Sequence, residues 1–336
     1  MKLRVILVLI ICWLLAASSG HRQHLPTKPK GWPEPVHPLP TQPVLIQLGR
    51  VLFYDPLLSA DSSISCASCH SPYNAFAHTD HALSHGIHDS IGKRNAPALI
   101  NLAWRTSFRH DGQFKELEEQ ILLPIQHPGE MAENFPNILH KQRQSKFYPD
   151  LFKRAYGDTL INQERNVNAL KAFLLSLISA NAKYDSVQYG TAVYNAQEEK
   201  GYRLFKEHCA SCHREPLFTN NTFEDIGLPE DPYLHDQGRA AVTGDPGHKY
   251  HFQVPTLRNI SYTYPYMHDG RFTHLRQILD HYSEHIEKRN SIATLLQQPI
   301  QLNPDEKVEL TSFLLCLNDK NFIFHSEYGY PKNIIK

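Results

Sequence analysis

Two copies of the pentapeptide Cys-Ala-Ser-Cys-His, at residues 66–70 and 209–213, are the clearest chemical signal in this sequence. In each copy two cysteines stand three positions apart, so both thiols can form thioethers with the two vinyl groups of one haem. The histidine that follows can then bind one face of the iron as an axial ligand. Zinc sites and thioredoxin-like redox sites also use Cys-x-x-Cys pairs, but neither needs the histidine that comes next. We therefore expect two covalently bound haems c. The predicted attachment residues are Cys66, Cys69 and His70 for the first haem, and Cys209, Cys212 and His213 for the second.

The segments that flank the two motifs also repeat, which indicates two copies of one structural plan. A Gly-x-x-Leu-Phe-like helix segment precedes each motif, and two further segments follow each motif with a constant offset between the halves. The matching pairs are 49–53 with 201–205, 97–101 with 255–259, and 110–114 with 268–272. Each half is thus predicted to be a short helix, a haem motif, a long loop-rich cover and a closing helix. This pattern predicts a mainly α, loop-rich fold of two tandem cytochrome c-like domains, each around one covalently bound haem c.

Helical signals support the closing helix of each half. Leu170, Phe173 and Leu174 fall at the spacing of one helix face. Asn303, followed by Pro304, is a plausible cap and first turn of the last helix. Signals for strands are sparse.

The two ends of the chain look different from the repeated body. Residues 1–20 have a basic start, a short apolar run and small residues, as a cleaved secretory signal peptide does; an uncleaved membrane anchor is the alternative. Export agrees with haem attachment outside the cytoplasm, so we expect a periplasmic protein. Residues 21–43 are proline-rich and form either an arm that packs on the body or a plain spacer. The remaining predicted boundaries are an N-terminal domain at 44–185, a C-terminal domain at 186–325 and a tail at 326–336.

Charge and cysteine content narrow the function further. The 336 residues carry a formal net charge of +0, so nothing indicates a nucleic acid partner or an anionic membrane surface. Of the six cysteines, Cys12 lies in the signal segment, four belong to the haem motifs, and Cys316 is expected to be a buried core thiol. No pair is left for a structural disulfide.

The repeat predicts that the two irons differ in their second axial ligand. Tyr282 lies fourteen residues beyond His268 in the second half, whereas the same count from His110 reaches Pro124, which has no donor group. Met267 and His268 are weaker alternatives for the second haem. A saturated iron transfers electrons, and an iron with a vacant face can bind peroxide. We therefore expect the second haem to be an electron carrier and the first haem to be open.

The first half offers acid–base groups for such an open iron. A carboxylate can take a proton from the near oxygen of peroxide and return it to the far one, and Glu130 and Gln120 are the candidates. From the residues alone, Glu130 could equally be a solvated loop acid. A histidine-rich loop also occurs in this half, and we interpret it as a loop near haem propionates with at most one functional member. Its members are His78, His81, His85 and His88.

Taken together, these residues resemble the bacterial dihaem cytochrome c peroxidases and their relatives that mature tryptophan tryptophylquinone in methylamine dehydrogenase. The resemblance covers about residues 43–320 and includes the segments 94–97, 117–120, 128–131 and 265–270 besides both haem motifs. It implies that the N-terminal haem reduces hydrogen peroxide. The C-terminal haem would receive electrons from a small cytochrome c or copper protein, and the enzyme would often be a homodimer.

The same resemblance assigns roles to single residues. Gln120 and Glu130 would lie over the peroxidatic iron, and His85 would cap that iron in the resting oxidised enzyme. A calcium ion would lie between the domains, where oxygen donors suit it. Its implied ligands are the side chain of Asn95 and the backbone carbonyls of Thr263 and Pro265.

Two positions depart from the usual peroxidase pattern. His110 stands where the peroxidases have a tryptophan between the haems, so electrons would pass through His110, the nearby Trp104 or another route. Tyr282 stands where they have methionine, as in the quinone-maturing branch. We expect a periplasmic cytochrome c peroxidase. The alternatives are a dihaem oxidase that modifies a tryptophan or other side chain of a partner protein, and a non-catalytic dihaem electron carrier.

Overall fold

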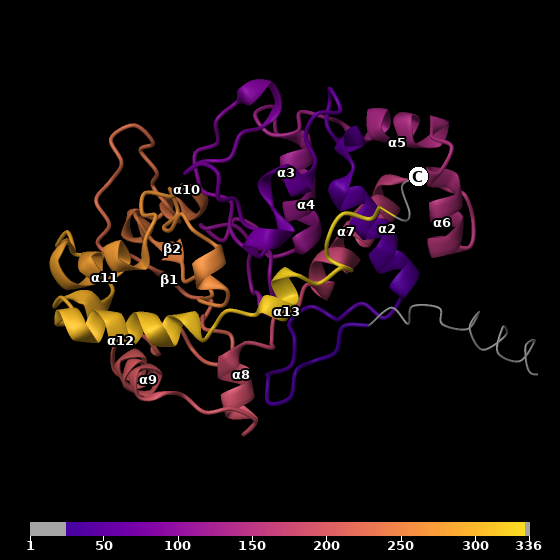
Figure 1. Cartoon of the computed structure of the whole chain (residues 1–336). Coiled ribbons are helices and arrows are strands. Elements are labelled where there is room, and N and C mark those ends of the chain that lie inside the picture. Colours follow the sequence, from indigo (N-terminus) through magenta and orange to yellow (C-terminus); the bar gives the residue numbers. More distant parts are fainter. Residues whose placement is uncertain (1–24, 333–336) are drawn as a thin grey trace, which may run out of the picture.

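The computed structural model describes residues 25–332 (Figure 1). The expected signal peptide with Cys12, residues 21–24 of the proline-rich segment and residues 333–336 lie outside the described range. Among residues 25–332, no helix has both the length and the apolar composition needed to cross a membrane.

The described chain is built almost entirely of helices and loops, which confirms the predicted mainly α, loop-rich fold. Its α-helices are α2 (Pro43–Tyr54), α3 (Cys66–Cys69), α4 (Leu117–Gln126), α5 (Phe135–Gln144), α6 (Tyr148–Tyr156), α7 (Gln163–Ser176), α8 (Lys183–Gln188), α9 (Ala196–His208), α10 (Ala240–Thr243), α11 (Leu275–Glu284), α12 (Pro304–Leu315) and α13 (Lys320–Ile323). Its short 3-10 helices are η1 (Pro56–Leu58), η2 (Pro72–Asn74), η3 (Ile87–Asp89), η4 (Leu102–Trp104), η5 (Pro246–His248), η6 (Ile260–Tyr262) and η7 (Thr294–Leu296). Two strands, β1 (Phe223–Glu224) and β2 (Phe252–Gln253), pair antiparallel.

Each half contains a pair of helices that cross at a glycine. In the first half α2 crosses α7, and a methyl group on Gly49 would lie 2.6 Å from the carbonyl carbon of Ala169. In the second half α9 crosses α12, and a methyl group on Gly201 would lie 2.6 Å from the carbonyl carbon of Glu309. Glycine is therefore needed at both crossings, because any side chain would push the helices apart. The matching positions show that the sequence repeat is also a structural repeat.

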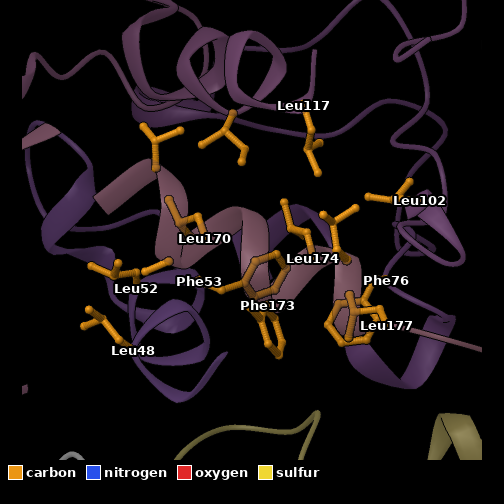
Figure 2. Close-up of a cluster of buried hydrophobic side chains, with 14 of the residues drawn as sticks. Leu48, Leu52, Phe53, Phe76, Leu102, Leu117, Leu170, Phe173, Leu174 and Leu177 are labelled. Carbon is orange, nitrogen blue, oxygen red and sulfur yellow. The ribbon is translucent and has the colours of Figure 1, made fainter. Parts of the chain in front are cut away.

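The first hydrophobic core forms around the α2–α7 pair (Figure 2). Figure 2 shows Leu170, Phe173 and Leu174 of α7 among side chains from α2 and α4. The Phe53 and Phe173 rings lie 5.2 Å apart between their centroids. Leu170, Phe173 and Leu174 are all buried, so the helix face predicted from their spacing is confirmed.

The second core forms around the α9–α12 pair. Phe205 and Phe313 lie 5.0 Å apart between ring centroids, which matches the Phe53–Phe173 contact of the first half. The Asn303 side chain accepts hydrogen bonds from the backbone N–H groups of Asp305 and Glu306 at the start of α12, so the predicted cap is confirmed. Cys316 follows α12 and is buried, with 5% of its surface exposed.

Residues 25–42 pack along the body as an arm. Trp32 is buried and meets Trp104 of the first half edge to face, with 4.9 Å between ring centroids. The guanidinium carbon of Arg258, in the second half, lies 4.7 Å from the Trp32 ring. The backbone N–H of His37 donates to the carbonyl of Ala103. The arm therefore contacts both halves of the molecule.

The chain beyond α12 returns to the first half (Figure 1). Phe322 and Ile323 of α13 belong to the first core, and Arg50 of α2 donates to the carbonyls of Ser326 and Gly329. The sequence analysis places residues up to 325 in the second domain, whereas these side chains pack on the first. The reason is physical: α13 has only four residues, too few to carry a periodic pattern of its own.

Candidate functional site

The first Cys-x-x-Cys-His motif forms α3 and the residue after it. The Nδ1 atom of His70 lies 2.7 Å from the carbonyl oxygen of Phe76. Because a carbonyl can only accept, Nδ1 carries the proton and Nε2 is left as the free ligand nitrogen. Burial lowers the pKa of His70 to about 4, so the imidazole is neutral, as an iron ligand must be. Burial also raises the pKa of the Cys66 thiol to about 12.

Glu130 lies close to this motif. After the larger effect of burial, its negative charge further raises the pKa of both Cys66 and Cys69. Its carboxylate also lies 3.8 Å from Nδ1 of His127, and both side chains remain partly exposed. The structure thus brings a proton-accepting group to the edge of the first motif.

The loop that carries His85 packs directly on the loop that carries Glu130. The backbone N–H of Ile87 donates to the carbonyl of Glu130 over 2.7 Å. A methyl group on Gly86 would lie 2.6 Å from Cα of Glu130, so only glycine lets the two loops meet. The Cys69 sulfur lies 3.7 Å from the carbonyl oxygen of His85. His85 itself forms an ion pair with Asp89, 2.5 Å from Nδ1, when its imidazole is protonated.

Helix α4 brings Gln120 to the same half. The Oε1 atom of Gln120 is buried and has no hydrogen-bond partner within the described chain. Such an orphaned acceptor is unusual, because buried polar atoms are nearly always paired. It fits a residue whose partner belongs to a bound group or substrate.

The predicted equivalence of Pro124 and Tyr282 is visible in the helices. Helix α4 contains Pro124, α11 contains Tyr282, and the bounds of the two helices correspond residue by residue under the repeat. Proline has no side-chain donor, whereas tyrosine has a hydroxyl. The two halves therefore differ at one position of one helix.

The second Cys-x-x-Cys-His motif opens on a largely apolar cavity of about 290 Å³. Cys209, Cys212 and His213 line it, and so do apolar side chains of α11 and α12. Nδ1 of His213 lies 3.1 Å from the carbonyls of both Phe218 and Pro255, which again leaves Nε2 as the free nitrogen. Burial lowers the pKa of His213 and raises the pKa of Cys209 to about 12.

Three candidate sixth ligands line this cavity: Tyr282, Met267 and His268. Burial raises the pKa of the Tyr282 hydroxyl well above its ordinary value, and the nearness of Cys209 and Cys212 adds to this effect. Tyr282 therefore lies beside both attachment cysteines. His268 is instead stacked on Phe252, with ring centroids 3.7 Å apart.

The segment between the two motifs holds the residues predicted for electron transfer and calcium. Nε2 of His110 lies 2.9 Å from the carbonyl of Asn95, and His110 lines the second cavity. Asn95, Thr263 and Pro265 line the same cavity, so the structure gathers the three predicted calcium ligands there. Trp104 is not among the residues that line it; its indole N–H donates to the carbonyl of Pro33 in the arm.

The histidine-rich loop forms a stack of rings. His78 and His81 lie 5.6 Å apart between centroids, and His81 and His85 lie 4.6 Å apart. Stacked rings do not aim their nitrogens at one point, and among residues 25–332 no three His, Cys, Asp or Glu side chains converge as around a bare metal ion. The same finding weighs against zinc at either Cys-x-x-Cys pair.

The sequence analysis quoted Arg94 only as part of a motif and missed its contacts. Its guanidinium bonds to Asp111 and to Asp236, 142 positions away, with distances of 2.5 Å to each. Both carboxylates are buried, and Asp236 lines the second cavity. Arg94 thereby ties the segment between the motifs to the second half. Buried ion pairs are costly unless satisfied on both sides, so this one fixes geometry rather than adding much stability.

The residues present fit two haems c. Each motif supplies two buried neutral thiols for thioether bonds and one neutral histidine with a free Nε2. The second motif opens on an apolar cavity, and the first has an orphaned polar atom in its half of the molecule. These are the donor set and the surroundings that covalent haem requires.

Comparisons with known proteins agree with this arrangement. Residues 43–192 match the family model described as di-haem cytochrome c peroxidase. The methylamine utilization protein MauG of Methylorubrum extorquens is 34% identical over 83% of this chain and 79% of its own length. The cytochrome c551 peroxidase of Nitrosomonas europaea is 31% identical over 84% of each chain.

A solved structure has the same overall form. A crystal structure of a MauG-like protein associated with microbial copper homeostasis superposes with a TM-score of 0.83 at 28% identity. The match covers 91% of this chain and 98% of that one.

Proposed function

The chain belongs to the di-haem cytochrome c peroxidase family, and on that premise we propose that it reduces hydrogen peroxide to water in the periplasm. The electrons come from a small cytochrome c or a cupredoxin. Two haems c are what this family implies.

The observation that carries the proposal is the asymmetry between the two halves. The first half has Pro124 in α4, the Glu130 loop beside its cysteines and the unpartnered Gln120. The second half has Tyr282 at the corresponding position of α11, beside Cys209 and Cys212. One half is equipped for acid–base chemistry and the other for holding a sixth ligand.

The chain's own residues move protons in the first half. When bound, haem supplies an iron that binds peroxide and accepts one of its oxygens. Glu130 takes the proton from the peroxide oxygen nearer the iron and returns it to the far oxygen, which leaves as water. Gln120 orients the peroxide or water through its free Oε1. The packing of Gly86 on Glu130 holds the carboxylate in place.

The second half takes in electrons and passes them on. Tyr282 is the preferred sixth ligand because it lies beside both attachment cysteines, and Met267 is the weaker alternative. His110 is the preferred bridge between the halves. It lines the second cavity and bonds to Asn95, and the backbone of Pro97 in the same segment hydrogen-bonds to His70. Calcium bound by Asn95, Thr263 and Pro265 would fix this segment, since carbonyl and amide oxygens suit that ion.

Tyr282 also favours a second candidate function, the oxidation of a side chain on a partner protein. A tyrosine ligand would lower the reduction potential of the second haem relative to methionine, so both haems could share oxidising equivalents. The relative from Methylorubrum extorquens is a methylamine utilization protein. Rapid peroxide turnover with a reduced cytochrome as donor would count against this candidate.

The test of the proposed function is the variant Glu130→Gln. It keeps the shape of the side chain and removes its proton chemistry, so peroxide turnover with reduced cytochrome c should fall by about 10²–10⁴-fold while both haems stay attached. Glu119→Gln, an exposed acid on α4, is the matched control and should leave turnover unchanged. Wild-type turnover in the Glu130 variant would refute the role given to this residue.

A further inference from the structure

A second cavity lies away from the peroxide site, between the arm, α2 and the C-terminal segment. Its volume is about 480 Å³, within the range of small-molecule sites. It is lined by arm residues between Leu25 and Lys30, by Ile46 and Gln47 of α2, and by residues 321–328. None of the residues given a role in peroxide chemistry lines it.

Two polar atoms in its lining residues have no partner within the described chain. They are Oε1 of Gln47 and Nδ1 of His325, and both atoms are buried. Oε1 can only accept a hydrogen bond, and a ring nitrogen without a proton can do the same. Each unpaired buried polar group costs about 1–3 kcal/mol, so a ligand that donates a proton to either atom would gain affinity.

The rest of the lining selects a neutral aromatic molecule. Phe173, Phe322 and Tyr328 provide ring faces and edges on one side, and Pro26 and Pro29 provide flat apolar surface on the other. The charged residues among the described lining are one cation and one anion. They are Lys30 and Glu327, so the cavity carries no net charge for an ionic ligand.

The cavity also lies one layer of side chains behind the first haem motif. The ring centroids of Phe173, Phe322 and Tyr328 are 6.1, 6.0 and 6.5 Å from that of Phe76. The carbonyl of Phe76 accepts the proton of His70 Nδ1. A ligand in the cavity is thus separated from the axial histidine by one aromatic layer, a short path for electron tunnelling.

We propose that this cavity binds a hydroquinone-type phenol as a second, small-molecule reductant, held through hydroxyl hydrogen bonds to Gln47 and His325. The electron-transfer part rests on the proposed peroxide reduction; the binding part does not. The chemistry balances: hydroquinone gives up two electrons and two protons to become benzoquinone, and hydrogen peroxide takes up two of each to become two waters. His325 accepts the first phenolic proton as the electron leaves toward Phe76.

The first arm of the test is binding to the resting holoprotein without peroxide, by calorimetry. Hydroquinone should bind, and 1,4-dimethoxybenzene, which has the same ring but no donor, should bind about tenfold more weakly. Gln47→Leu and His325→Phe should each raise the dissociation constant of hydroquinone about tenfold, since loss of one such bond is worth about 1.4 kcal/mol. Gln197→Leu on α9 and His140→Phe on α5 change exposed residues of the same types and should bind as the wild type does.

The second arm compares two electron donors. The ratio of hydroquinone-driven to cytochrome-driven peroxide turnover should fall about tenfold in both cavity variants. Hydroquinone binding that is absent, unchanged in both variants or matched by dimethoxybenzene would overturn the proposal. If neither donor supports peroxide turnover although hydroquinone binds as described, the proposed function fails and the binding site stands.

Discussion

The contact between the His85 loop and the Glu130 loop can be broken by a single methyl group. Gly86 has φ −97° and ψ −160°, an extended conformation that alanine also adopts, so Gly86→Ala adds no backbone strain. The added Cβ would lie 2.6 Å from Cα of Glu130 and would also meet the carbonyl of Gly129. Ordinary contacts begin at 3.4 Å, so the two loops must separate by about 0.8 Å.

The expected loss is large because the carboxylate moves with its loop. A misplacement of about 1 Å can cost about 10²-fold in rate, so Gly86→Ala should lower peroxide turnover by about that factor. The hydrogen bond from Ile87 to Glu130 would also stretch, and overpacking should lower the free energy of unfolding by about 1–3 kcal/mol. The assay is steady-state oxidation of reduced cytochrome c by hydrogen peroxide, with the melting temperature measured in parallel.

Gly92→Ala is the matched control on the same loop. There the added methyl would lie 3.3 Å from the nearest atom, the carbonyl oxygen of Ser84, and a shift of a few tenths of an ångström relieves it. This variant should turn over peroxide like the wild type. Wild-type turnover by a folded Gly86→Ala protein would refute the claim that this packing positions Glu130.

Three further predictions follow from other parts of the molecule. Tyr282→Met should raise the reduction potential of the second haem and leave the spectrum of the first unchanged, which redox titration would show. His110→Ala should slow electron exchange between the haems after flash reduction and leave peroxide binding intact. For Glu133, burial alone would raise the pKa, but hydrogen bonds from Lys141 and Asn137 outweigh it and hold the pKa below the ordinary value. Its carboxylate therefore stabilises the fold above about pH 5, and the stabilisation is lost as pH falls through the lowered pKa. Glu133→Gln should cost about 1.5–3 kcal/mol at pH 7 and much less near pH 3, as chemical denaturation at both pH values would show. Equal costs at the two pH values would contradict this reasoning.

The repeated fold could be predicted because its determinants are local. The Cys-x-x-Cys-His motifs, the helix-crossing glycines and the Asn303 cap each act within a few residues, so short sequence patterns reveal them. The alignment of Pro124 with Tyr282 follows from the same repeat, and α4 and α11 bear it out.

Long-range contacts could not be predicted. The pairing of Arg94 with Asp236 and the insertion of Trp32 between Trp104 and Arg258 join segments far apart in the chain. No local periodicity encodes such partners, because the partner is chosen only when the two halves pack together. The cavity behind the first motif is hidden for the same reason, since three separate segments build it.

The most direct test of the asymmetry is electron paramagnetic resonance of the half-reduced protein, with and without hydrogen peroxide. With the second haem reduced, the account predicts that the first iron is high-spin and pentacoordinate and that its signal changes when peroxide is added. Low-spin, six-coordinate signals that persist at every redox state and do not respond to peroxide would contradict it.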